Sequence, residues 1–349
     1  MRALRRLALA AMLASVSAAQ ADVGLLMRPD VQRFIDEQVA SGEVSRAELE
    51  TVFANVDAKP NVITIMDKPS TARPWYQFRP NFYNEKLLQE GVAFWQKNEA
   101  TLQRAQQQFG VAPEMIVAIL GIETRYGRVT GSFRLADVLS TLAFDYPRRA
   151  EFFRGELAEF FRLAHSENVN ALSLKGSYAG AIGMPQFMPS SFRKWAVDFD
   201  GDGHRDIWNN PADAIGSVGN YFQQHGWLVG DDVVVPVDVT PGAAIDELVA
   251  DKFNLHYTVA ELKAKGIVPR APVRDEALAV LVPLEVAPGD TRYWLGLNNF
   301  YTITRYNKST LYAMVAQELA QEIRNRYLAV RYAPVPAVAN QDASAPAVN

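Results

Sequence analysis

Hydrophobic residues recur at helical spacing through most of the chain, with glycine and proline between the runs. In the stretch VAPEMIVAILGIETRYG, Ile116, Leu120 and Glu123 fall on one face of a helix. Pro113 suits the first turn and Gly127 suits the residue that follows the last turn, so a helix is predicted between them. This helix carries a carboxylate on its apolar face. A carboxylate in that position needs either a partner or a function.

The same spacing predicts further helices. Residues 57–82 are rich in proline and aromatic residues, so we expect an ordered extended segment there rather than a helix. Two helices are predicted on either side of a break at Ser41-Gly42, and Ser45 caps the second of them. A long helix is predicted over Asn84–Phe109, and a final one over Ser309–Tyr327. Two more are predicted within the stretches FRLADVLSTLAFDY and RRAEFFRGELAEFFRLAHSE.

The pattern changes near Gly230. The stretches DDVVVPVDV and ALAVLVPLEV are short and β-branched, which predicts strands, and RYWLGLNNFYTITRY is aromatic and expected to be β-rich. Between them, VAELKAKG is long enough for a short helix. We therefore expect a small β-containing insertion over residues 230–292 of an α+β protein that is mainly helical.

The two ends of the chain have the composition of processed or unstructured segments. Residues 1–21 have a basic start, an apolar middle and an Ala19-Gln20-Ala21 end, as in a secretory signal peptide cleaved before Asp22. The alternative is a membrane anchor, but the apolar run is too short to span a bilayer. Residues 331–349 are mostly alanine, proline and small polar residues, which predicts a disordered tail.

Composition narrows the function. The chain has 349 residues, no cysteine and a formal net charge of −4, which becomes −7 when the three arginines of the signal peptide are removed. Without cysteine there are no disulfides, thiol nucleophiles, thiolate metal sites or cysteine-linked lipids. A mildly acidic chain without a basic run is a poor candidate for nucleic-acid binding. We therefore expect a soluble protein of a bacterial-type periplasm.

Glu123 is the first candidate for chemistry. Burial among apolar side chains disfavours the ionised carboxylate and raises its pKa, so that a proton can be held near neutral pH for general acid catalysis. The alternative is a structural ion pair with Arg125 or Arg128.

The stretch GSYAGAIGMPQFMPSSF, residues 176–192, predicts a tight loop with exposed backbone. Ser177 and Gln186 offer hydrogen bonds to the hydroxyl and amide groups of a ligand. The alternative is a glycine-rich packing turn.

The stretch DFDGDGHRDIW matches the start of a calcium-binding EF-hand loop, and oxygen ligands at alternating positions suit a hard cation. The match departs at position 12, where Asn209 replaces the expected glutamate, and Asp213 is the candidate for the closing carboxylate. Asp213 also fits the first turn of a helix that begins after Asn210. The residues at positions 1, 3, 5, 6 and 7 are Asp198, Asp200, Asp202, Gly203 and His204.

Two weaker signals remain. Arg148 and Arg149 open a helix, where a solvated surface pair is the simplest interpretation. Six aromatic residues are candidates for stacking on sugar rings; the alternative, which applies to most aromatic residues, is a place in the core, so only some of the six are expected to bind sugar. The six are Trp75, Tyr76, Phe78, Tyr221, Tyr301 and Tyr306.

Together, the motifs resemble the lytic murein transglycosylase B family, glycoside hydrolase family 103, from about residue 30 to 330. They occur in that family's order: GIETRYGR, LSTLAFDYPRRAEFF, LKGSYAGAIGMPQFMPSSF, VDFDGDGHRDIW, DAIGSVGNYFQQHGW and NFYTITRYN. The resemblance implies cleavage of the bond between N-acetylmuramic acid and N-acetylglucosamine in peptidoglycan. Glu123 would be the sole catalytic acid and base.

The resemblance also assigns the other site residues. The glycan groove would be lined by Ser177, Gln186, Tyr221, Tyr306 and the pair Arg148 and Arg149. Phe78 stands where a tyrosine hydroxyl is expected near the sugar. Calcium, held by Asp198, Asp200, Asp202, His204 and Asp213, is also a family feature, although the loop is one residue longer before Asp213.

The implied architecture is a lysozyme-like helical core with a second helical domain and a small β domain. The expected partners are peptidoglycan glycan strands and other cell-wall enzymes, with no membrane anchor. The expected segments are a signal peptide (1–21), an N-terminal helical region (22–112), the catalytic core (113–229) with the calcium loop (198–213), the β domain (230–292), a returning helical segment (293–330) and the tail (331–349).

Glycosidases usually use two carboxylates, but one suffices when the substrate's own N-acetyl group attacks the anomeric carbon. The hypothesis is then a 1,6-anhydro product formed without water. The two rival hypotheses are a hydrolytic muramidase and a non-catalytic calcium-dependent peptidoglycan-binding scaffold.

Overall fold

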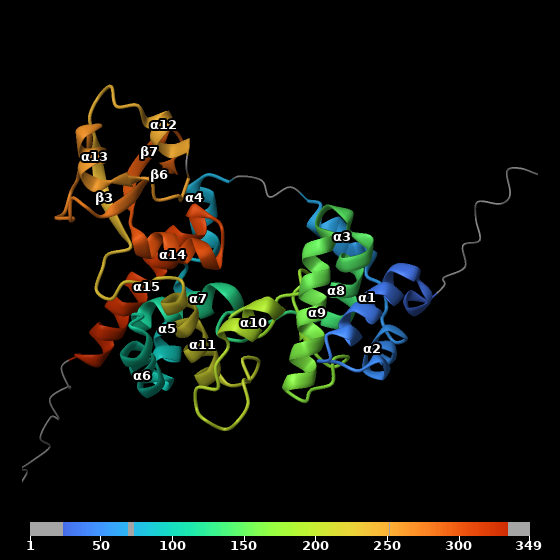
Figure 1. Ribbon diagram of the computed structural model, residues 1–349. Helices are drawn as coiled ribbons and strands as arrows, with labels where there is room; N and C mark the ends of the chain where they lie inside the picture. Colours follow the sequence, from blue (N-terminus) through green and yellow to red (C-terminus); the bar gives the residue numbers. More distant parts are fainter. Residues whose placement is uncertain (1–23, 69–72, 251, 334–349) are drawn as a thin grey trace, which may run out of the picture. The chain divides into compact units, whose positions relative to one another are not determined.

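The computed structural model describes residues 24–68, 73–250 and 252–333, so the predicted signal peptide and residues 334–349 of the predicted tail lie outside the described residues. The chain divides into two units, each built from two segments (Figure 1). The first unit is Met1–Ala72 with Gly127–Tyr221, and the second is Arg73–Tyr126 with Phe222–Asn349. The domain bounds expected from the sequence stay a prediction.

The first unit is helical around a cluster of phenylalanine rings. Phe34 of α1 (Pro29–Ala40), Phe53 of α2 (Arg46–Phe53), Phe144 of α8 (Leu135–Asp145) and Phe161 of α9 (Ala150–Ser166) lie 5.5–6.3 Å apart, centroid to centroid. Ser45 caps α2 with Glu48 in a reciprocal capping box, as the sequence predicts. The remaining elements are η1 (Leu25–Met27), α3 (Pro60–Met66), β1 (Phe133–Arg134), η3 (Pro147–Arg149), β2 (Lys175–Gly176), α10 (Pro189–Trp195) and most of α11 (Pro211–Gln224).

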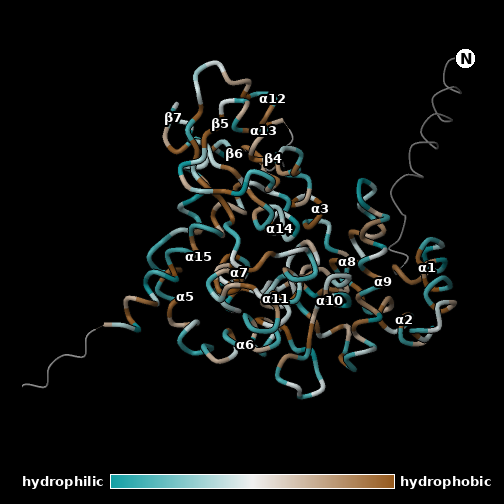
Figure 2. Tube along the Cα trace, turned by 60° about the vertical axis from the view of Figure 1, so that its left-hand side comes forward, coloured by the Kyte–Doolittle hydropathy of each residue, from teal (hydrophilic) through white to brown (hydrophobic). Residues whose placement is uncertain are grey.

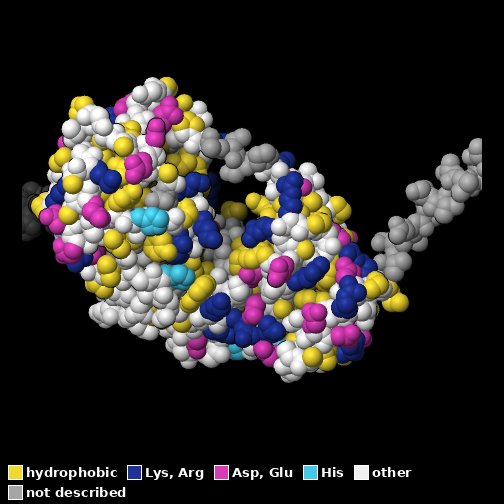
Figure 3. Space-filling model, turned by 45° about the horizontal axis from the view of Figure 1, so that its top comes forward, with side chains coloured by type: hydrophobic (Ala, Val, Ile, Leu, Met, Phe, Trp, Pro, Cys, Tyr) yellow, Lys and Arg dark blue, Asp and Glu magenta, His cyan; other side chains and the backbone are white. Residues whose placement is uncertain are grey.

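Charges on this unit are paired across its surface. Figure 3 shows Lys and Arg side chains beside Asp and Glu side chains over the first unit, and Arg193 Nη1 lies 2.8 Å from a Glu43 carboxylate oxygen. Exposed pairs of this kind contribute at most about 1 kcal/mol each.

Two sequence predictions about helices are wrong in detail. The segment 57–82, expected to be extended, contains α3, α4 (Trp75–Phe78) and the 3-10 turn η2 (Arg79–Asn81). Pro60 occupies the first turn of α3, where proline starts a helix instead of preventing one. The single helix expected over Asn84–Phe109 is divided at Asn98, whose backbone leaves the helical region between α5 (Glu85–Lys97) and α6 (Glu99–Phe109).

In the second unit, α7 (Pro113–Thr124) is the central helix. It packs against α5, α6 and α15 (Thr310–Arg331). Apolar residues cover its whole circumference (Figure 2), and Met115 through Gly121 are all buried. A helix that is hydrophobic on all sides is a core element. The rigid packing fixes the position of its last turn, where Glu123 lies.

The second unit also holds an antiparallel sheet with the strand order β4-β6-β7-β3-β5 (Figure 1). One face packs on α12 (Ile245–Ala250) and α13 (Val259–Ala264), where Val237, Leu248 and Leu295 are buried in one cluster. The strands are β3 (Val234–Val239), β4 (Tyr257–Thr258), β5 (Ile267–Pro269), β6 (Leu278–Ala287) and β7 (Asp290–Gly296).

The stretch RYWLGLNNFYTITRY is only partly β. Its first half ends β7, but Asn298–Tyr306 forms α14, so that prediction is wrong for its second half. Phe300 and Ile303 are both fully buried at helical spacing, so tertiary packing overrides the β preference of the threonines. The α+β class, mainly α, is confirmed. In the described part of the chain, no helix is long and apolar enough to cross a membrane.

Candidate active site

Glu123 lies in the last turn of α7, at a sharp helix end. Arg125, Tyr126 and Gly127 follow with φ of 51°, 60° and 87°, three consecutive left-handed residues. The amides of Arg125 and Tyr126 donate to carbonyls of the last turn, at 3.0 Å and 3.1 Å, which closes the helix. Left-handed conformations at two non-glycine residues store strain, and such strain persists only where the surroundings fix it.

Contacts of the Tyr126 side chain hold this left-handed turn in place. Its ring stacks on Phe94 with centroids 5.1 Å apart, and its hydroxyl donates to the Leu87 carbonyl at 3.2 Å. A Cβ built on Gly121 would lie 2.5 Å from the Tyr126 hydroxyl, and one on Gly91 would lie 2.6 Å from it. The two glycines therefore provide the space into which the tyrosine folds back. This packing holds the end of α7 under Glu123.

Tyr312, at the start of α15, is the hydrogen-bond partner of Glu123. Its hydroxyl donates to Glu123 Oε1 at 2.6 Å. Burial raises the pKa of Glu123 to about 7, and the Tyr312 hydroxyl acts in the opposite direction because it stabilises the ionised form. The residue as a whole is half-buried, at the end of its helix. This group exchanges a proton near neutral pH, as general acid–base catalysis requires.

Sequence reasoning missed Tyr312. It stands 189 positions after Glu123, in a helix whose periodicity predicts only a core position. Its place on the carboxylate comes from the packing of α15 against α7. No local signal in the sequence reports that contact.

In the first unit, Ser177 and Gln186 lie on the same predicted loop. Two antiparallel β-bridges hold this loop, one between Gly176 and Ile182 and one between Ile182 and Phe187. Ser177 Oγ accepts from the amides of Ala179 and Ala181, at 3.3 Å and 3.0 Å, so its own proton can be donated to a ligand. Gln186 is left-handed, with φ 52°, and its Nε2 donates to backbone carbonyls at 3.0 Å and 3.1 Å.

The other predicted glycan residues divide between the two units. Tyr221, in the first unit, is buried against Phe187 and Trp195. Arg148 Nη1 contacts Asp67 Oδ1 at 3.1 Å, and the Arg149 guanidinium lies 4.2 Å from the centroid of the exposed Phe152 ring.

Phe78 and Tyr306 lie with Glu123 in the second unit. The Phe78 ring stacks on Trp75 with centroids 6.4 Å apart, and Tyr306 stacks on Phe222 at 5.7 Å. Both are half-buried.

The acidic loop of the first unit has the donor set of a hard-cation site. Ligand atoms of Asp198, Asp200 and Asp202 lie within 4.8 Å of one another. Gly203, at the sixth position of the motif, has φ 93° and donates its amide to Asp198 Oδ2 at 2.8 Å. These features fit the turn of an EF-hand loop, and carboxylate oxygens are the ligands that calcium prefers.

Asp213 braces the same loop from α11. It is fully buried, Oδ1 accepts from the Phe199 amide at 2.7 Å, and Oδ2 accepts from the Asp206 amide at 2.8 Å. It stands outside the group of three aspartates, although each of its oxygens keeps a second lone pair. Asn210 accepts from the Ala212 amide at 2.9 Å, so the predicted helix start is also present.

The acidic loop is joined to the Ser177–Gln186 loop through Ile207. The Met184 amide donates to the Ile207 carbonyl at 2.8 Å, and a Cβ on Gly183 would lie 2.7 Å from that oxygen. The two loops therefore touch backbone to backbone. The turn that holds Gln186 is therefore in direct backbone contact with the segment that follows the aspartates.

Comparison with known proteins agrees with this geometry. The model of the transglycosylase SLT domain matches residues 27–321. The membrane-bound lytic murein transglycosylase B of Escherichia coli (strain K12) is 44% identical over 306 residues, which are 84% of this chain and 82% of that protein.

Two solved structures are similar as well. The soluble lytic transglycosylase SltB1 from Pseudomonas aeruginosa is 44% identical with a TM-score of 0.82, over 85% of this chain and 99% of that one. The Escherichia coli lytic transglycosylase Slt35 in complex with calcium is 42% identical with a TM-score of 0.80, over 88% and 98%.

Proposed function

The chain belongs to the transglycosylase SLT family and is a lytic transglycosylase of peptidoglycan, and from this premise we propose which residues carry the reaction. The enzyme cleaves the bond between N-acetylmuramic acid and N-acetylglucosamine and leaves a 1,6-anhydro end on the muramic acid. No water enters that product, so the leaving oxygen and the C6 hydroxyl must exchange one proton through the enzyme.

Glu123 is that proton carrier. In the first step its carboxylic acid protonates the leaving oxygen, while the acetamido carbonyl of the muramic acid attacks the anomeric carbon and forms an oxazolinium-like intermediate. In the second step the ionised Glu123 removes the proton of the C6 hydroxyl. That oxygen then attacks the anomeric carbon and displaces the acetamido oxygen. The carboxyl ends the cycle in its initial protonation state.

One observation supports this assignment above all others. Glu123 is a half-buried carboxyl with a pKa near 7, held by a hydroxyl at 2.6 Å at the end of a rigid core helix. A group that must give and then take the same proton works best when its pKa lies close to the working pH.

The remaining site residues are assigned to substrate binding. The free hydroxyl proton of Ser177 suits the acetamido carbonyl, and the Gln186 carboxamide suits sugar hydroxyls. Arg148 and Arg149 suit the carboxylates of the substrate. We assign the half-buried aromatic rings of Phe78 and Tyr306 to the sugar rings. Tyr221, which is buried, is assigned to the wall of the groove, where it packs on Phe187 beside Gln186.

Calcium is proposed for the acidic loop. Asp198, Asp200 and Asp202 would hold it, with the His204 carbonyl and Asp213 completing the ligand set. Calcium would supply the positive charge that these carboxylates need, and the complex of the similar Slt35 with calcium supports this assignment. The hydrogen bond from the Met184 amide to the Ile207 carbonyl supports a structural role for calcium, because it joins the loop to the turn that bears Gln186.

The export signal predicted over residues 1–21 supports a periplasmic location, where peptidoglycan strands are the partner. Other cell-wall enzymes are proposed as further partners.

The test uses purified sacculi with wild-type enzyme and the Glu123→Gln variant. Glutamine keeps the shape and the Tyr312 contact but cannot carry the proton, so we expect clearing to fall at least about a thousandfold with unchanged thermal unfolding. Mass spectrometry then separates the alternatives. Wild-type products one water lighter than hydrolysis products support transglycosylation, the heavier products indicate a muramidase, and binding without clearing indicates a scaffold. An active Gln variant would refute the role of Glu123.

A further inference from the structure

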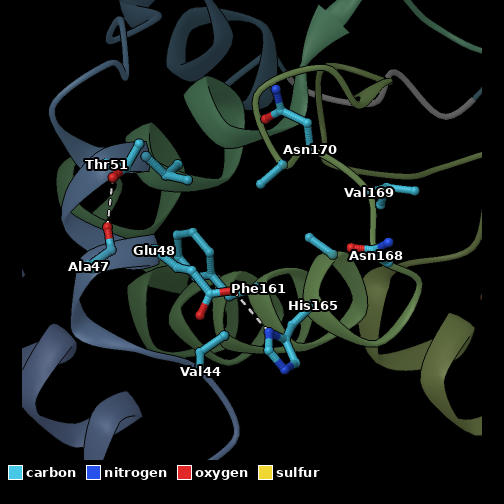
Figure 4. A pocket seen from close by; sticks show the side chains of 12 residues that line it. Val44, Ala47, Glu48, Thr51, Phe161, His165, Asn168, Val169 and Asn170 are labelled. Atoms are coloured by element: carbon cyan, nitrogen blue, oxygen red, sulfur yellow. Dashed lines mark hydrogen bonds and ion pairs between the residues drawn. The ribbon is translucent and has the colours of Figure 1, made fainter.

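A cleft lies in the first unit, with walls formed by α2, the end of α9 and the segment that follows α9 (Figure 4). It has a volume of about 570 Å³. None of Ser177, Gln186, Arg148 and Arg149 lines it. Ligand-binding pockets typically span about 300–1,000 Å³, so this cleft has the size of a binding site.

The floor of the cleft is apolar and its rim is polar. Val44, Val52, Phe161 and Ala164 line it and are buried, with at most 7% of each exposed. On the rim, Asn168 and Asn170 stand on the segment opposite α2 (Figure 4). An apolar floor with a few polar groups at the edge is typical of a small-ligand site.

The one acidic side chain that lines the cleft, Glu48, already has hydrogen-bond partners. Glu48 Oε2 accepts from the Ser45 amide at 2.8 Å and from the Ser45 hydroxyl at 2.6 Å, and Oε1 lies 2.9 Å from His165 Nδ1. The carboxylate also stands at the positive end of α2. Its hydrogen-bonding capacity is therefore used inside the protein, which leaves the two carboxamides as the polar groups that a ligand can bind.

The two carboxamides keep unused hydrogen-bonding capacity. Asn170 Oδ1 accepts from the Leu172 amide at 2.9 Å, which leaves its Nδ2 as a donor. Asn168 is exposed and left-handed, with φ 53°, and within the described residues its side-chain amide has no hydrogen-bond partner. A carboxamide presents donor and acceptor together, the pattern that hydroxyl and acetamido groups match.

A neighbouring cleft extends the first. It has a volume of about 440 Å³, shares Asn168 and Val169 with the first, and is also lined by Trp208. Its lining includes Asp202 and His204 of the acidic loop and the Glu167–Arg205 ion pair. Trp208 is half-buried and packs on Phe192 with centroids 5.5 Å apart, so its indole is held in place. An indole is a suitable surface for stacking a sugar ring. Two adjoining clefts suit a ligand made of consecutive similar units.

We propose that these clefts form a second glycan-binding site, which binds consecutive N-acetylated sugars of the peptidoglycan strand. The choice of glycan depends on the proposed function, and the hydroxyl and acetamido groups of N-acetylated sugars match the carboxamides of Asn168 and Asn170. A strand held here stays close to the enzyme between cleavages, which raises its effective concentration at Glu123.

The test measures binding of a β-1,4-linked N-acetylglucosamine tetramer to the Glu123→Gln enzyme by NMR. We expect the side-chain amide signals of Asn168 and Asn170 to shift on titration. Asn168→Gly removes the carboxamide and keeps the left-handed backbone, and Ala47→Trp fills the cleft from the exposed face of α2. Each change should weaken binding, followed at the Asn170 signal that both variants keep, about fivefold or more, because a lost hydrogen bond or a blocked cleft has that effect.

The matched control is Asn61→Ala, an exposed asparagine of the same unit that lines neither cleft. It should bind as its parent does. Tetramer shifts that leave Asn168 and Asn170 unmoved, or an affinity unchanged in both cleft variants, would overturn the proposal. Failure of the proposed function is recognised separately, since it would be seen as cleavage of sacculi by the Glu123→Gln enzyme.

Discussion

Replacing Tyr312 by phenylalanine removes one hydroxyl and keeps the ring that packs between α15 and α7. The lost hydroxyl is the donor to Glu123 Oε1 at 2.6 Å. That bond stabilises the ionised carboxylate and lowers its pKa, whereas burial raises it. With the bond gone and the burial intact, the pKa of Glu123 must rise above its value of about 7.

The size of the effect follows from the strength of the bond. A hydrogen bond to a charged group is worth about 1.5–3 kcal/mol, and a half-buried position favours the lower end of that range. Because about 1.4 kcal/mol corresponds to one pKa unit, the pKa of Glu123 should move to about 8 in Tyr312→Phe. The ionised form that follows proton donation loses the same stabilisation, so kcat should fall by about tenfold.

The assay is kcat/KM against pH between about 5 and 9, which reports the ionisation of the free enzyme. Cleavage needs the protonated acid, so kcat/KM of the wild-type enzyme should fall above pH 7. The same fall should begin about one pH unit higher in the variant. Tyr327→Phe is the matched control, because it removes another hydroxyl of α15, one that accepts from Arg331 at 2.8 Å. Its profile should follow the wild type. An alkaline limb in Tyr312→Phe that stays in place or moves to lower pH would refute the reasoning.

Three further predictions concern stability. The pKa of Glu123 rises from 4.5 to about 7 on folding, so native protein binds more protons between these values and loses up to about 3 kcal/mol of stability as pH rises through them. The free energy of unfolding is measured in urea at pH 4.5 and pH 8. Glu123→Gln should lack this loss, and equal losses in the wild type and in the variant would contradict the prediction. Calcium at a hundred times its Kd should raise the Tm by about 5 °C or more. Asp200→Ala, which removes the ligand oxygens, should abolish that response, and magnesium should not reproduce it. Gly121→Ala, whose Cβ would meet the Tyr126 hydroxyl at 2.5 Å, should lower the free energy of unfolding by about 2 kcal/mol. The control is Gly155→Ala, also in a helix but with open space around the new Cβ, which should raise the free energy of unfolding by about 0.5–1 kcal/mol. If both substitutions changed the stability in the same direction, the clash with Tyr126 would be excluded.

Sequence patterns that act over a few residues, such as helix caps and apolar spacing, correctly predicted the positions of single helices and turns. The proline of α7 and the apolar stripe before Glu123 located that helix, because both act within a few residues. The Ser45 cap and the left-handed glycine of the acidic loop are of the same kind.

Features that depend on distant contacts were not predictable in this way. Tyr312 reaches Glu123 only because two helices far apart in the chain pack together. The helix over Asn298–Tyr306 contradicts its own β-branched composition, because burial of Phe300 and Ile303 needs helical spacing. The cleft at Asn168 is likewise assembled from segments that the sequence does not connect.

The most direct test of the account is the titration of Glu123 itself, followed by ¹³C NMR of its side-chain carboxyl in the wild-type enzyme with Glu123→Gln to assign the signal. We expect a midpoint near pH 7, well above the ordinary value of 4.5. A midpoint at 4.5 would mean that the carboxyl is ionised at neutral pH and has no proton to give to the leaving sugar, which would contradict the proposed mechanism.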